Sequence, residues 1–84
     1  RPADEELDEA GEALYQRLRT WRSTTAEATG VPAYVVAHDA LLRRIAAARP
    51  QDEAALLALK GMGPKRMEKH GAALLAVVRG EEGE

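Results

Sequence analysis

Three groups of helix-breaking residues divide this 84-residue chain into short segments, and they constrain its fold more than any other feature. They lie at residues 30–32 (Gly-Val-Pro), 49–50 (Arg-Pro) and 61–64 (Gly-Met-Gly-Pro). Glycine readily adopts the left-handed conformation that ends a helix, and proline cannot continue one. The segments between the breaks carry apolar residues at helical spacing. The sequence therefore predicts an all-α fold, a compact bundle of about five helices in which one long N-terminal helix is crossed by several short ones.

The predicted long helix runs from about residue 4 to residue 29 and carries an apolar stripe along one face. Asp4 or Asp8 is the expected N-cap, since a short carboxylate can accept from the unpaired N–H groups of a first turn. Trp21, the only tryptophan, lies on the stripe and is expected to be part of the core. Gly30 is expected to end the helix.

The remaining helices are predicted from the same signals. One helical turn is expected within residues 31–38, followed by a helix over residues 40–48 with Asp39 as its cap. A short helix capped by Asp52 or Gln51 extends to about residue 59. Pro64 suits the first position of the next helix, where its missing N–H has no cost. That helix is expected to reach about residue 70, where Gly71 breaks or bends it before a last apolar stretch.

Size and composition limit the possible functions. A chain of 84 residues forms one domain, with a core over about residues 7–79 and frayed acidic ends at 1–6 and 80–84. It contains no cysteine, which excludes disulfides, thiol catalysis and cysteine-based zinc sites. The two histidines lack metal-ligand spacing. We therefore expect no catalysis by this domain, no cofactor, no membrane span and no metal, and we expect a monomer in the cytoplasm.

The net charge of −2 hides a segregation of charge along the chain. Residues 1–14 have a net charge of −5, residues 15–79 a net charge of +6, and the last five residues a charge of −3. A basic body between acidic ends indicates either an electrostatic partner or solvation of the chain ends.

The turn at residues 61–64 allows two interpretations. Two glycines around an apolar residue, between short amphipathic helices, are typical of a helix–hairpin–helix turn, whose second helix offers free N–H groups to a phosphate. Lys65, Arg66 and Lys69 follow within two turns and would add positive potential. The same glycines also suit a simple helix stop. In either case Met62 is expected to anchor the turn in the core.

Several motifs in fixed order resemble the HRDC domain, the helicase and RNase D C-terminal module. They are Leu-Arg-Thr-Trp-Arg at residues 18–22, Gly-Val-Pro-Ala-Tyr-Val-Val at 30–36, His-Asp at 38–39, Gly-Met-Gly at 61–63 and the stretch at 66–71. The resemblance covers roughly residues 10–79. Met62 replaces a smaller aliphatic residue, and His70 stands where the family commonly has an aromatic residue.

The resemblance implies a five-helix accessory domain of a RecQ-type DNA helicase, or alternatively of an RNase D-like nuclease. Such domains modulate DNA engagement through weak contacts with single-stranded or junction-like DNA, or through contacts with the helicase core or sibling domains. An exposed Tyr34 would stack on an unpaired base, whereas a buried one would pack on the core. Candidate nucleic-acid contacts are Arg19, Arg22, Tyr34, Lys60, Lys65, Arg66 and Lys69. Candidate interdomain contacts are Glu5, Glu9 and Glu12, and candidate structural residues are Trp21, Gly61 and Gly63.

Overall fold

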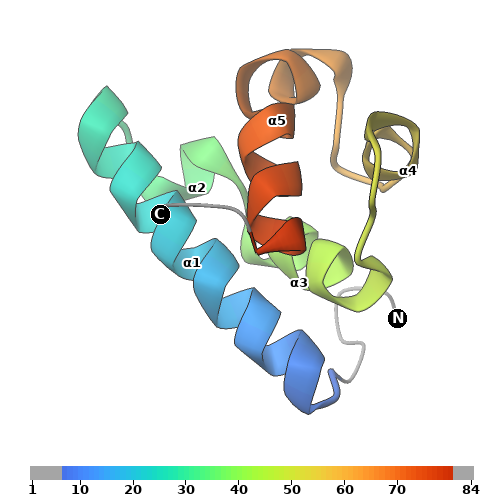
Figure 1. Ribbon diagram of the computed structural model, residues 1–84. Helices are drawn as coiled ribbons and strands as arrows, with labels where there is room; N and C mark the ends of the chain where they lie inside the picture. Colours follow the sequence, from blue (N-terminus) through green and yellow to red (C-terminus); the bar gives the residue numbers. More distant parts are fainter. Residues whose placement is uncertain (1–6, 81–84) are drawn as a thin grey trace.

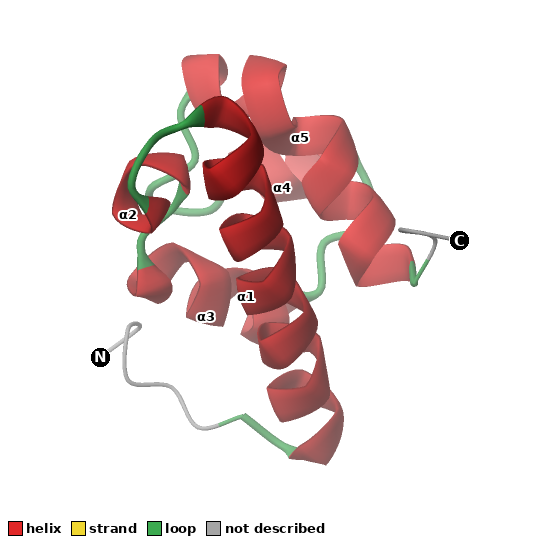
Figure 2. Cartoon of the chain, turned by 90° about the vertical axis from the view of Figure 1, so that its left-hand side faces the viewer, coloured by secondary structure: helices red, strands yellow, loops and turns green. Residues whose placement is uncertain are grey.

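The computed structural model describes residues 7–80, which form five α-helices (Figure 1). In chain order these are α1 (Glu9–Thr29), α2 (Ala33–Val36), α3 (Asp39–Ala48), α4 (Glu53–Leu57) and α5 (Pro64–Arg79). Residues 7–80 contain no strand, and the predicted all-α class is confirmed. Figure 2 shows α1 across the front, with α2 and α3 on one side of it and α5 on the other.

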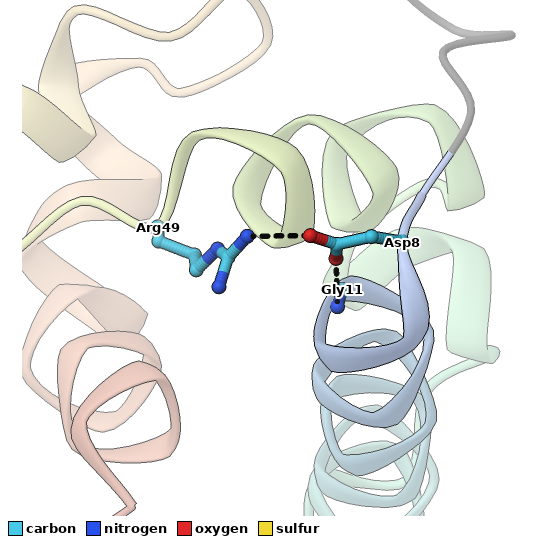
Figure 3. A network of polar contacts seen from close by, with 3 residues as sticks. All are labelled: Asp8, Gly11 and Arg49. Carbon is cyan, nitrogen blue, oxygen red and sulfur yellow. Dashed lines mark hydrogen bonds and ion pairs between the residues drawn. The ribbon is translucent and has the colours of Figure 1, made fainter.

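The start of α1 is fixed by Asp8, one of the two predicted caps. Its carboxylate accepts from the backbone N–H of Gly11 at 2.7 Å and from the guanidinium of Arg49 at 3.3 Å (Figure 3). The Gly11 N–H lowers the pKa of Asp8, and Arg49 lowers it further. Because Arg49 follows α3, this contact joins the start of one helix to the end of another. The alternative cap, Asp4, lies outside the described residues.

The other helix ends follow the predicted breaks. Gly30 ends α1 with φ of 75°, and Asp52 caps α4 by accepting from Ala55 N–H at 2.8 Å. Pro64 is the first residue of α5. Helix α4 ends at Leu57, two residues earlier than predicted, and the chain continues into the turn.

Two predictions of helix ends were wrong. Asp39 is the first residue of α3 and not its cap, because its carboxylate pairs instead with the guanidinium of Arg22 at 2.8 Å. Gly71 neither breaks nor ends α5, which continues to Arg79. The side chain of Met67 covers the position where a Gly71 Cβ would stand, and apolar residues beyond it bury that face of the helix in the core.

One core lies between α1, α3, α4 and α5. Its fully buried large side chains are Leu18, Leu41, Leu42, Ile45, Leu56, Leu74 and Val77. Burying a side chain of this size contributes roughly 1.5–3 kcal/mol. Trp21 packs against this core but remains partly exposed. The packing of the helices around this core also places three segments near one another: the end of α1, the whole of α2 and the start of α5.

Candidate nucleic-acid interface

The turn before α5 has the features that both interpretations of its sequence predicted. Gly61 has φ of 98°, a conformation that favours glycine, and Met62 is only 4% exposed. The N–H of Met62 donates to the carbonyl of Leu59 at 3.1 Å. Gly63 occupies the N-cap position of α5 in an extended conformation. The turn therefore anchors itself in the core through Met62 and directs the start of α5 outward.

Two arginines hold the turn through its carbonyl groups. Arg44 Nη1 donates to the carbonyl of Lys60 at 3.2 Å, and Arg66 Nη1 donates to the carbonyl of Gly61 at 2.9 Å. Arg66 Nε also donates to the carbonyl of Val36 at 3.0 Å. The side chain of Arg66 thus joins α2 to the turn, a structural task that its position in the sequence did not predict.

A groove of about 640 Å³ separates the end of α1 and α2 from the start of α5. One side is formed by Thr29 and three valines, and the other by the turn and the first two turns of α5. Its lining residues are Thr29, Val31, Val35, Val36, Gly63, Pro64, Lys65, Arg66, Lys69 and His70. Among residues 7–80, three cations and no carboxylate line this groove. The groove is therefore apolar on one side and positively charged on the other.

Tyr34 lies on α2 in a second and shallower depression, whose lining residues differ from those of the groove. Its side chain is 63% exposed, so it does not pack on the core, and its ring stacks on that of His38 with centroids 6.3 Å apart. Arg22 and Asp39 also line this depression. An exposed aromatic ring of this kind can stack on an unpaired base.

Arg22, predicted as a nucleic-acid contact, is mostly buried within the domain. Its side chain is 12% exposed and donates to the carbonyl of Ala37 at 3.0 Å besides pairing with Asp39. The guanidinium therefore ties α1 to the segment between α2 and α3. A role in DNA contact stays a prediction for this residue.

The remaining predicted residues lie away from the groove. Arg19 stands over the ring of Tyr15, with Cζ 5.8 Å from the ring centroid, and Arg43 stands over the same ring at 4.7 Å. Lys60 is exposed before the turn and does not line the groove. Glu9 and Glu12 are exposed in the first turn of α1. Glu5 lies outside the described residues.

His70 belongs to the groove, although it was not among the predicted contacts. Its ring meets that of Trp21 edge-on, with centroids 5.4 Å apart and an interplanar angle of 81°. Burial lowers the pKa of His70 below its ordinary value, and Arg66 and Lys69 lower it further. Its position four residues after Arg66 on a helix was the signal that could have placed it beside the cations.

Residues 7–80 offer neither a membrane span nor a metal site. No helix in this range is long and apolar enough to cross a membrane. The same residues contain no cluster of three or more His, Asp or Glu side chains that could hold a metal ion.

Comparisons with known proteins place the chain in a family. The family model of the HRDC domain matches residues 11–78. The chain is 45% identical over 69 residues to the ATP-dependent DNA helicase UvrD2 of Mycobacterium tuberculosis, which covers 82% of this chain and 10% of that protein. It is 33% identical over 66 residues to the ATP-dependent DNA helicase RecQ of Bacillus subtilis, covering 79% of this chain and 11% of that protein.

A further relative, the ATP-dependent DNA helicase RecQ of Pasteurella multocida, is 32% identical over 66 residues, which are 79% of this chain and 10% of that protein. The chain thus spans about a tenth of the length of the curated relatives it matches. No solved structure matches it significantly. The family match covers all the motifs on which the resemblance rested, and the chain belongs to the HRDC domain family.

Proposed function

We propose that this domain is a non-catalytic accessory module of a DNA helicase and that it binds single-stranded or junction-like DNA weakly. The groove between α2 and the start of α5 is the proposed contact surface. The observation that carries the proposal is the convergence of Lys65, Arg66 and Lys69 opposite the valine side of the groove. The exposed Tyr34 lies on α2, the same helix that supplies two of those valines. In this arrangement the cations bind phosphates while the tyrosine stacks on a base.

The size of the groove limits the expected affinity. If two to four phosphates are neutralised, the slope of log K against log salt concentration is roughly −1.4 to −2.8 for a single strand. Such binding corresponds to a Kd of about 10⁻⁴–10⁻⁶ M near physiological salt. The domain would then adjust how firmly a larger enzyme holds DNA and would not hold DNA by itself.

Titration of a labelled single-stranded oligonucleotide at low salt tests this proposal. Lys69→Ala should weaken binding several-fold, since Lys69 lines the groove. Lys60→Ala is a matched control because it removes the same charge from an exposed site outside the groove. Equal losses in the two variants would exclude the groove as the contact surface. Absence of binding at about 1 mM would exclude DNA contact altogether.

A docking role for the acidic end of α1 is a second candidate function. Glu9 and Glu12 are exposed in the first turn, whereas Thr29 at the other end of the same helix lines the groove. Twenty residues of helix separate these ends by about 30 Å at a rise of about 1.5 Å per residue. An acidic contact with the helicase core or a sibling domain would therefore leave the groove open.

Charge reversal tests the docking role separately. Changing Glu9 and Glu12 to lysine should alter unwinding or DNA affinity of the parent enzyme, while the isolated domain should lose no DNA affinity. An unchanged parent enzyme would exclude docking through this end. A nuclease parent of the RNase D type stays an alternative, and the protein sequence preceding the domain distinguishes the two: a P-loop indicates a helicase, a carboxylate-rich exonuclease fold a nuclease.

A further inference from the structure

Among the described residues that line the groove, His70 is the one whose charge can change near neutral pH. The other charged residues of the groove, Lys65, Arg66 and Lys69, keep their charge over this range. From α1, His70 is approached by the uncharged ring of Trp21. The lining residues from the end of α1 through α2 are a threonine and valines, and none of the described residues that line the groove is a carboxylate. Burial lowers the pKa of His70, and the neighbouring Arg66 and Lys69 lower it further.

An anion bound in the groove would change which protonation state of His70 is favoured. In the free domain, partial burial and, after it, the two neighbouring cations favour the neutral imidazole. A phosphate bound between Lys65, Arg66 and Lys69 would neutralise their field and place a negative charge near the ring. Both changes favour the imidazolium, which then donates a charge-assisted hydrogen bond to the phosphate.

We propose that His70 is a proton-linked contact for a nucleic-acid backbone, neutral in the free domain and protonated when a phosphate occupies the groove. The inference rests on the proposed function and adds a regulatory property to the same site. Binding takes up a proton, so affinity rises as pH falls. Because the site is partly exposed, we expect an increase of about three- to tenfold between pH of about 8 and about 5.5.

The chain contains its own reporter of this protonation. Trp21 is the only tryptophan, and its ring meets that of His70 edge-on. A protonated imidazole quenches indole fluorescence by contact. The pH midpoint of Trp21 emission in the intact domain therefore follows His70, and it should move to higher pH when oligothymidylate is added. A midpoint that does not move would overturn the inference, even if His70 variants failed to fold.

Binding measurements with variants complete the test. Oligothymidylate is the probe because thymine does not titrate over this pH range, and the ionic strength and a pH-insensitive label are held constant. Wild type should bind more tightly at low pH, and His70→Gln should bind with little pH dependence. The matched control is His38→Gln, which removes the other histidine of the chain and should retain the wild-type ratio of affinities.

The outcomes separate the two proposals. Equal pH dependence in wild type and His70→Gln would overturn the role of His70 and leave DNA binding by the groove intact. A pH dependence lost in His38→Gln but retained in His70→Gln would assign the proton uptake to His38 and overturn the inference. No binding of wild type at about 1 mM at either pH would refute the proposed function, and the inference with it.

Discussion

The two glycines of the turn should respond in opposite ways to the same substitution. Gly61 has φ of 98°, whereas Gly63 has φ of −88° and ψ of 173°. A Cβ at Gly61 would lie 3.6 Å from Leu41 Cδ1 and 3.7 Å from Arg44 Nη1, which are ordinary contact distances. A Cβ at Gly63 would have no neighbour within 4 Å. Space is therefore available at both positions, and the backbone conformation alone distinguishes them.

The magnitudes follow from that difference. Gly61→Ser forces a residue with a Cβ into a left-handed conformation and should lower the free energy of unfolding by about 1–2 kcal/mol. In a domain of this size, this corresponds to a fall in Tm of about 4–8 °C per kcal/mol. Gly63→Ser keeps an extended conformation and gains an N-cap hydroxyl, so it should be neutral or stabilising by a few tenths of a kcal/mol.

Urea denaturation followed by far-ultraviolet circular dichroism measures both variants. The midpoint should fall for Gly61→Ser and stay or rise for Gly63→Ser, with similar m-values in the two transitions. If Gly63→Ser destabilised the domain as much as Gly61→Ser, the reasoning from backbone conformation would be refuted, and the turn would depend on the absence of side chains at both positions.

Three further outcomes are expected from the polar contacts and can be measured by the same denaturation. Arg66→Ala should lower the free energy of unfolding by about 1–3 kcal/mol, because two backbone carbonyls lose their donor; a loss below about 0.5 kcal/mol would show that water replaces the guanidinium. Asp39→Asn should cost at most about 1 kcal/mol, since this carboxylate is 66% exposed, whereas Arg22→Ala should cost more because it also frees a carbonyl. Because the pKa of His70 is lowered in the folded domain, the unfolded chain binds more protons than the folded domain below pH 6.5. The free energy of unfolding should therefore fall on acidification through that range, and it should fall less in His70→Gln. Equal slopes of this free energy against pH in the wild type and the variant would contradict the assignment.

The helix boundaries that depend on local chemistry could be predicted from the sequence. Asp8 as a cap, Gly30 as a stop and Pro64 as a first helical residue each act within one turn of their own position. Asp39 was misassigned because its partner, Arg22, lies on another helix and no local pattern indicates it. The break expected at Gly71 failed for a similar reason, since burial of the residues beyond it outweighs the weak helix propensity of glycine.

The candidate site was predictable only in part. The spacing of Arg66, Lys69 and His70 places them on one face of a helix, and this much can be read from the sequence. Their position opposite the valines of residues 31–36 depends on how α2 crosses the start of α5, which spacing does not indicate. Spacing also does not show that the two cations differ in their contacts: the donors of Arg66 bind backbone carbonyls of the domain itself.

The double attachment of Arg66 determines the shape of the groove as well as its charge. One guanidinium binds the last residue of α2 and the turn before α5, so it sets the width of the groove between them. Lysine presents its donors from a single point and cannot span both carbonyls in the same way. Arg66→Lys would therefore keep the positive charge of the groove but would no longer hold α2 and the turn at a fixed distance. A comparison of this variant with the wild type would separate the effect of a fixed groove width from the effect of charge.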